Sequence, residues 1–183
     1  MTIPPSLTTP PLPDSPQGIG AALKSHIQRQ IQEAGGWIGF DTFMALALYT
    51  PGLGYYAHGS AKFGPLPQGG SDFVTAPEIS PLFGQALARQ VAQALEVSGT
   101  DEVWEFGAGT GALALQLLDA LDAMGVRVRR YTIVDLSESL KDRQRQALAA
   151  HAGKVQWATA LPTAMRGVVV GNEVLDAMPV QLL

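Results

Sequence analysis

The sequence contains no cysteine and no long uninterrupted hydrophobic run. The missing cysteine excludes a disulfide framework, a thiolate zinc site and a cysteine nucleophile. No apolar stretch approaches the roughly 20 residues needed to cross a bilayer, so we expect no membrane insertion. Sixteen acidic against twelve basic residues, a net charge of −4, leave no broad basic surface for a nucleic acid. The histidines His26, His58 and His151 are scattered and predict no metal site.

The first eighteen residues contain six prolines and neither lysine nor arginine. This composition matches neither a secretory signal, which begins with positive charge, nor an arginine-rich transit peptide. We therefore expect a disordered leader over residues 1–18. The absence of cysteine fits a reducing, cytoplasmic compartment, so we expect a cytoplasmic protein.

The region 19–99 is predicted to be helical, with one long irregular connection. Apolar spacing and stop signals predict helices over about 19–34, 41–50 and 81–98. The connection over 51–70 is rich in glycine and proline and carries the pair Tyr55-Tyr56. Long irregular loops are often functional.

Beyond Gly99 the chain alternates between short apolar segments and amphipathic ones. Strands are predicted over 102–106, 131–135, 155–158 and 167–171, and helices over 112–124 and 138–151. Alternating strands and helices predict an α/β fold with a doubly wound parallel sheet, in the strand order 3-2-1-4.

A glycine turn, Gly107-Ala108-Gly109-Thr110-Gly111, follows the first predicted strand and opens the helix that comes next. Glycines at this point let a ligand approach the backbone, and the helix N-terminus offers free N–H groups. The turn therefore predicts a small-molecule cofactor. Together with Ala112 it also fits the dinucleotide pattern G-x-G-x-x-A, so the turn alone leaves the cofactor open.

Two acidic residues bear on the choice of cofactor. Glu105, at the carboxyl end of the first strand, would repel a pyrophosphate and attract an amino-acid-like cation, which favours S-adenosylmethionine over NAD. The alternative is an exposed acid at a strand end. Asp135 follows the second strand and can accept hydrogen bonds from both ribose hydroxyls, as it could with either cofactor.

Three polar residues follow the fourth predicted strand. Asn172, Glu173 and Asp176 lie there, and in the order 3-2-1-4 this strand end borders the same crevice as the glycine turn. We expect these side chains to face the reacting part of the cofactor. The alternative for Asp176 is that it caps the turn before Pro179.

Five segments together resemble the MidA-like family of S-adenosylmethionine-dependent methyltransferases: PGLGYY, DFVTAPEISPLFG, VWEFGAGTGALA, YTIVDLS and GNEVLDAMPV. The resemblance spans residues 19–180. It implies a Rossmann-like class I methyltransferase fold with S-adenosyl-L-methionine as the cofactor. The cofactor contacts implied are Glu105, Gly107, Ala108, Gly109, Gly111, Asp135, Asn172 and Thr75.

The resemblance also suggests a substrate and a reaction. Some members assist assembly of respiratory complex I and methylate an arginine of one of its subunits, so a protein arginine is the implied acceptor. Glu173 and Asp176 would then hold the guanidinium and accept its proton. Tyr55, Tyr56, Asp72 and Thr75 are candidates for a lid, although Thr75 and Glu78 also have the spacing of a local capping box.

The chain departs from the family in two ways. Asp135 stands where the family more often has glutamate, which keeps the carboxylate. Family members are also longer, so we expect residues 100–183 to be the N-terminal half of a methyltransferase domain, with later strands missing and an exposed sheet edge covered by a partner or by a second copy. The alternatives are an assembly module without activity and an NAD-dependent oxidoreductase.

Overall fold

The computed structural model describes residues 16–57, 74–135 and 138–182. The chain divides into two compact units. Of the described residues, 16–57 and 177–182 belong to the first unit, and 74–135 and 138–176 belong to the second.

The first unit is built on two helices that pack together, α1 (Pro16–Glu33) and α2 (Phe40–Tyr49). Residues 16–18 of the expected leader form the first turn of α1, and residues 1–15 lie outside the described ones. Proline suits a first helical turn because the N–H it lacks would have no helical partner there. Helix α2 begins one residue before the predicted start, since the Gly39 carbonyl already accepts from the Phe43 N–H at 3.0 Å.

The C-terminal segment of the first unit is held to α2 by polar contacts. The Tyr49 hydroxyl donates to the Ala177 carbonyl at 2.8 Å, and the Gln181 side chain donates to Asp41 at 3.4 Å. Residues far apart in the sequence therefore meet in this unit.

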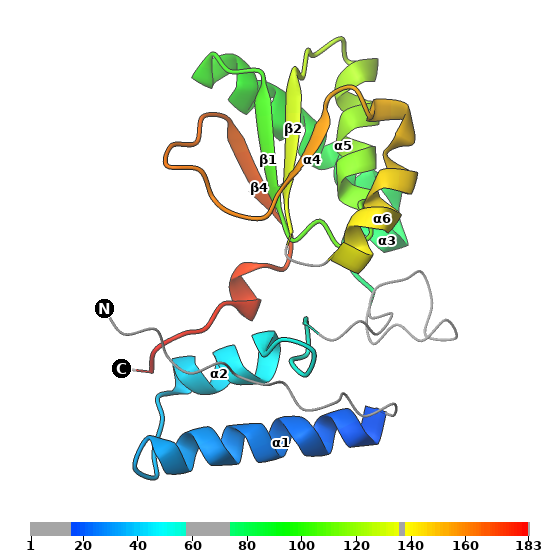
Figure 1. Cartoon of the computed structure of the whole chain (residues 1–183). Helices are drawn as coiled ribbons and strands as arrows, with labels where there is room; N and C mark the ends of the chain where they lie inside the picture. Colours follow the sequence, from blue (N-terminus) through cyan, green and yellow to red (C-terminus); the bar gives the residue numbers. More distant parts are fainter. Residues whose placement is uncertain (1–15, 58–73, 136–137, 183) are drawn as a thin grey trace. The chain divides into compact units, whose positions relative to one another are not determined.

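The second unit contains a four-stranded parallel sheet in the order β3-β2-β1-β4 (Figure 1). The strands are β1 (Glu102–Phe106), β2 (Arg130–Val134), β3 (Val155–Ala158) and β4 (Val168–Gly171). All three pairings are parallel, which confirms the predicted fold class and strand order.

Helix α5 (Ala112–Ala123) joins β1 to β2, and α6 (Glu138–Ala147) leads toward β3. The helix predicted over 138–151 is thus shorter than expected. The chain tightens after Ala147 into a 3₁₀ turn, η2 (Ala149–His151), and the Leu148 carbonyl accepts from the His151 N–H at 2.9 Å.

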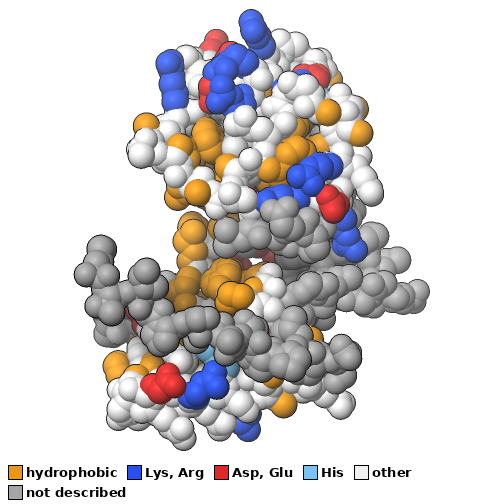
Figure 2. Space-filling view, viewed as in Figure 1, with side chains coloured by type: hydrophobic (Ala, Val, Ile, Leu, Met, Phe, Trp, Pro, Cys, Tyr) orange, Lys and Arg blue, Asp and Glu red, His pale blue; other side chains and the backbone are white. Residues whose placement is uncertain are grey.

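Basic side chains of the sheet unit lie close to acidic ones on the face drawn in Figure 2. Arg129 pairs with Asp101 and Glu102, and the Lys154 ammonium contacts Asp122 at 2.6 Å. These pairs neutralise part of the basic charge locally.

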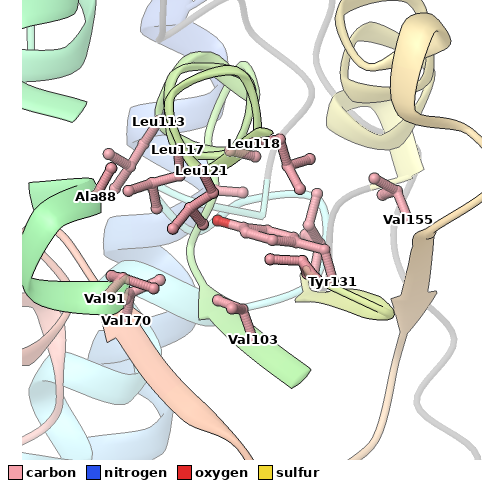
Figure 3. Packing of buried hydrophobic residues seen from close by; sticks show 14 of the residues in the cluster. Ala88, Val91, Val103, Leu113, Leu117, Leu118, Leu121, Tyr131, Val155 and Val170 are labelled. Carbon is pink, nitrogen blue, oxygen red and sulfur yellow. The ribbon is translucent and has the colours of Figure 1, made fainter. Parts of the chain in front are cut away.

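The core lies between the sheet and helices α4 (Pro81–Ser98) and α5. Alternate strand residues face the helices, and Figure 3 shows the leucines of α5 pointing toward Val103 and Tyr131. Both of these strand residues are fully buried, as are Leu117 and Leu121. On edge strand β4, by contrast, Val169 is 55% exposed.

Within the described part of the sheet unit, the strands are preceded by α3 (Ala76–Ile79) and α4. Ser80 caps α4 by accepting from the Leu82 N–H at 3.2 Å. Both helices pack against α5 and belong to the sheet unit, so the unit does not begin at residue 100 as expected. Short α3 was not anticipated from the sequence.

Gln116 of α5 forms hydrogen bonds to both α3 and α4. Its amide nitrogen donates to the Pro77 carbonyl at 2.7 Å, and its amide oxygen accepts from the Gly84 N–H at 3.1 Å. A Cβ at Gly84 would overlap the Gln116 Cβ, so α4 approaches α5 closely only because position 84 has no side chain.

No described helix is both long enough and apolar enough to cross a membrane.

The close approach at Gly84 predicts that Gly84→Ala lowers the free energy of unfolding by about 1 to 3 kcal/mol, because α4 must move away from α5. Gly20→Ala is the matched control, since Gly20 is exposed in α1 and a Cβ there would contact nothing. It should raise stability by up to about 1 kcal/mol through helix propensity. Urea unfolding followed by circular dichroism measures both, and unchanged stability of Gly84→Ala would contradict the packing.

Candidate functional site

The candidate site lies where β1, β2 and β4 end. The register pairs Phe106 of β1 with Val134 of β2 and with Gly171 of β4, so the three strands end side by side. The Gly107 N–H donates to the Val134 carbonyl at 3.3 Å, which extends the pairing one residue past β1. The structure thus brings the glycine turn, Asp135 and the segment after β4 to one edge, as predicted.

The glycine turn is tight and its backbone conformation requires glycine. Gly107 and Gly111 have φ values of 64° and 89°, which side-chain-bearing residues rarely adopt. Between them the Ala108 carbonyl accepts from the Gly111 N–H at 2.8 Å. Gly111 then starts α5 without a side-chain cap, and the first N–H groups of a helix have no partner within it. These groups are available to a ligand.

The segment after β4 packs against this turn. A Cβ at Gly107 would come within 3.0 Å of Cγ2 of Val174. Asn172 is half-buried, while Glu173 and Asp176 are exposed. Glu173 has a φ of 53°, the one described non-glycine residue with positive φ. Such strained conformations concentrate at functional sites, which supports the choice of this segment as the reacting part of the site.

Asp176 lies in a short 3₁₀ turn, η3 (Leu175–Ala177), with its side chain exposed. Among the described residues, no group of three or more histidine, aspartate or glutamate side chains could hold a metal ion.

Asp135 follows β2 and is held from two sides. Its backbone N–H donates to the Ala158 carbonyl at 3.4 Å, and its carboxylate accepts from the Gln144 amide at 2.9 Å. The same amide nitrogen donates to the Gly109 carbonyl at 2.9 Å. The predicted ribose acceptor and the glycine turn therefore share a hydrogen-bonding partner.

Glu105 does not open onto the crevice as the sequence analysis expected. The alternation along β1 turns its side chain to the same face as Val103, where it is 1% exposed and accepts a hydrogen bond from the Tyr131 hydroxyl at 2.6 Å. It is not an exposed strand-end acid either. Burial raises the pKa of Glu105 to about 7, and the bond from Tyr131 opposes that shift.

Thr75 stands at the N-cap of α3, but the capping box, the alternative that its spacing from Glu78 left open, does not form. Its carbonyl accepts from the Glu78 N–H at 2.9 Å, while its side chain makes no cap hydrogen bond. The Glu78 carboxylate instead accepts from the hydroxyl of Thr110 in the glycine turn. Through Glu78, the Thr75 segment is anchored beside the candidate site.

Of the four lid candidates, Thr75 lies in the sheet unit beside the site. Tyr55 and Tyr56 belong to the first unit, where their rings meet edge to face at 5.0 Å. Asp72 lies outside the described residues. The lid therefore stays a prediction.

Sequence reasoning missed Glu78 as a partner of the turn and missed Gln144 altogether. A signal for Gln144 was present, because Gln144, Leu148 and His151 recur at helical spacing and all are buried. A polar residue in such a stripe needs hydrogen-bond partners.

Comparison with known proteins identifies the family. A family model for S-adenosyl-L-methionine-dependent methyltransferases matches residues 86–183, and the chain belongs to this family. The family membership confirms the resemblance found in the sequence. It also confirms S-adenosylmethionine, rather than a nicotinamide dinucleotide, as the cofactor of the family.

One similar solved structure is a Burkholderia thailandensis protein bound to S-adenosyl-homocysteine. The two chains are 55% identical with a TM-score of 0.83, over 93% of this chain and 46% of the other. The chain is also similar to mitochondrial proteins named protein arginine methyltransferase NDUFAF7. The Caenorhabditis elegans homolog is 27% identical over 75% of this chain and 38% of its own length, and the Xenopus laevis protein is 30% identical over 80% and 34%.

The chain thus spans less than half the length of these relatives. The relatives named NDUFAF7 are mitochondrial by name, while the cytoplasmic location expected for this chain stays a prediction.

Burial of Glu105 predicts a pH-dependent contribution to stability. Between its ordinary pKa of 4.5 and about 7, the unfolded chain releases a proton that the folded chain keeps. Stability therefore falls as pH rises through this window and levels off above it. Glu105→Gln lacks this contribution. Between pH 4.5 and about 7, its free energy of unfolding should therefore rise by roughly 3 kcal/mol relative to that of the wild type.

Tyr131→Phe provides the complementary test, because the Tyr131 hydroxyl opposes the rise in the Glu105 pKa. Loss of this hydroxyl should raise the Glu105 pKa further, so stability should continue to fall up to a higher pH than in the wild type. Urea unfolding at a series of pH values measures both effects. Parallel pH profiles for the wild type and Glu105→Gln would show that Glu105 is ionised when folded.

Proposed function

We propose that this chain forms the cofactor-binding region of an S-adenosylmethionine-dependent methyltransferase that methylates arginine in a protein. The observation that carries the proposal is the meeting of the glycine turn, Asp135 and the acidic segment 172–176 at the ends of three parallel strands. The names of the relatives, protein arginine methyltransferases, support the choice of acceptor.

The residues of the site fit this cofactor. The Asp135 carboxylate can accept hydrogen bonds from both ribose hydroxyls. The N–H groups in the first turn of α5, which have no partner within the helix, suit the carboxylate of the methionine part, because a helix N-terminus favours negative charge. Gly107, Ala108, Gly109 and Gly111 allow close backbone approach, and half-buried Asn172 offers an amide to the reacting part of the cofactor.

The buried position of Glu105 changes its proposed role. Its buried carboxylate accepts a hydrogen bond from Tyr131 and so joins β1 to β2. Glu105 is therefore proposed to hold the strands that carry the site rather than to contact the cofactor. Thr75 is proposed to border the site through the contact of Glu78 with Thr110.

When bound, S-adenosylmethionine supplies a methyl group on a sulfonium sulfur, already activated for in-line transfer. The protein has to align the acceptor and exclude water. Glu173 and Asp176 would hold the planar guanidinium through charge-assisted hydrogen bonds. One of them would also accept the proton that the attacking nitrogen loses as its bond to the methyl carbon forms and the bond from carbon to sulfur breaks.

Two carboxylates suit this task better than one. A guanidinium has a pKa above 12, so its proton is lost only together with bond formation, and a nearby anion stabilises the positive charge until then. The exposed side chains of Glu173 and Asp176 are accessible to a large acceptor such as a protein segment.

The ribose role of Asp135 predicts that Asp135→Ala binds S-adenosylhomocysteine at least about tenfold more weakly, since hydrogen bonds to a charged group are lost. Asp142→Ala is the matched control, because Asp142 lies on α6 with an exposed side chain that pairs with Arg145. It should bind like the wild type. Isothermal calorimetry measures both, and equal affinity of Asp135→Ala would remove Asp135 from the cofactor site.

The proton-accepting role predicts that Glu173→Gln keeps the affinity for S-adenosylhomocysteine and loses at least about a hundredfold in turnover. Glutamine keeps the size of the side chain and removes its charge. Transfer of a radiolabelled methyl group to arginine-containing peptides measures turnover, and calorimetry measures affinity. Unchanged turnover would contradict the role of Glu173. Cofactor binding by the wild type without methylation of any acceptor would favour an assembly module.

A further inference from the structure

Gln144 lies in the middle of α6 with its side chain fully buried. Its side-chain amide makes three hydrogen bonds, two through the nitrogen and one through the oxygen. The nitrogen donates to the Gly109 carbonyl and to Oδ2 of Asp135, both at 2.9 Å, and the oxygen accepts from Nε1 of Trp157 at 2.8 Å. One side chain thus joins the glycine turn, the predicted ribose acceptor and strand β3.

The chemistry of these partners fixes which way the amide points. An indole N–H can only donate, so the amide oxygen must face Trp157. The nitrogen then faces a carbonyl and a carboxylate, which can only accept. The opposite orientation would set the indole N–H against the NH₂ group and the oxygen against two other oxygens. Arg145, with its guanidinium carbon 5.3 Å from the Trp157 ring centre, covers that ring.

The glycine turn also packs directly on Gln144. A Cβ at Gly111 would come within 3.4 Å of the Cα and Cγ atoms of Gln144. The turn is therefore held to α6 by the bond at Gly109 and by the close contact at Gly111. Neither contact requires a ligand.

We propose that Gln144 is a positioning residue for the cofactor site, which sets the Asp135 carboxylate and the glycine turn in their binding arrangement before the cofactor arrives. This inference rests on the proposed function, because it gives Asp135 the ribose. A carboxylate offers several acceptor positions, so donation from Gln144 is compatible with donation from ribose hydroxyls. Preorganisation of this kind raises affinity because less ordering is left to binding.

The structure suggests two substitutions that separate positioning from general destabilisation. Gln144→Leu removes the donations to Asp135 and Gly109, and should weaken binding of S-adenosylhomocysteine about tenfold to a hundredfold. Gln144→Glu keeps an acceptor for Trp157 but places a second carboxylate beside Asp135. It should bind poorly at pH 8 and regain affinity toward pH 5.5, where the introduced carboxyl group is protonated and can again donate.

Gln116→Glu is the matched control, a glutamine to glutamate change inside the same unit. It keeps the acceptor for the Gly84 N–H and loses the donation to Pro77, so it should cost stability without adding a pH-dependent step to the affinity. The wild-type pH profile is the reference, because Glu105, with a pKa of about 7, interacts electrostatically with Asp135. Trp157→Phe, which frees the amide to turn, should give a smaller loss than Gln144→Leu.

A measurement without ligand separates this inference from the proposed function. In Gln144→Leu the backbone amides of residues 109–111 should exchange hydrogen at least about tenfold faster than in the wild type, while those of β1 stay protected. Wild-type affinity and wild-type exchange in Gln144→Leu would overturn the positioning role. Failure of the wild type to bind S-adenosylhomocysteine would contradict the proposed function, and the exchange rates would still decide whether Gln144 holds the turn.

Discussion

The parallel pairing of β1 with both β2 and β4 is the constraint on which the candidate site depends. Because all strands run the same way, the segments that follow them emerge at one edge of the sheet. The glycine turn, Asp135 and the segment 172–176 are separated by many residues in the sequence, yet the register places them beside one another. A one-residue shift of either pairing would turn the alternating side chains of that strand to the other face.

Near this edge, buried and half-buried polar groups are matched with partners. Glu105 is bonded to Tyr131, Gln144 to Asp135, and Glu78 to Thr110. Among the described residues, no buried side-chain nitrogen or oxygen lacks a hydrogen-bond partner. Unsatisfied groups in such a place would each cost about 1 to 3 kcal/mol, so the pairs fix the positions of the elements that carry the site. Glu78 of α3 and Gln144 of α6 each form a hydrogen bond to the glycine turn.

The sequence was sufficient to predict the strands, their order and the edge at which the site lies. Apolar segments separated by helical ones define a parallel sheet, and Gly107 and Gly111, both with positive φ, mark the turn that follows β1. The direction of individual side chains was harder to predict. Glu105 was expected at the crevice because it ends a strand, but its alternation with Val103 places it in the core. The partners of Gln144 come from three separate segments, which only the folded chain brings together.

A crystal structure of the chain with S-adenosylhomocysteine would show whether the cofactor binds where β1, β2 and β4 end. We expect the ribose hydroxyls to lie within hydrogen-bond distance of the Asp135 carboxylate, with the backbone of the glycine turn against the ligand and Gln144 still bonded to Asp135. A ligand bound at another edge of the sheet, or a ribose turned away from Asp135, would contradict this placement of the cofactor.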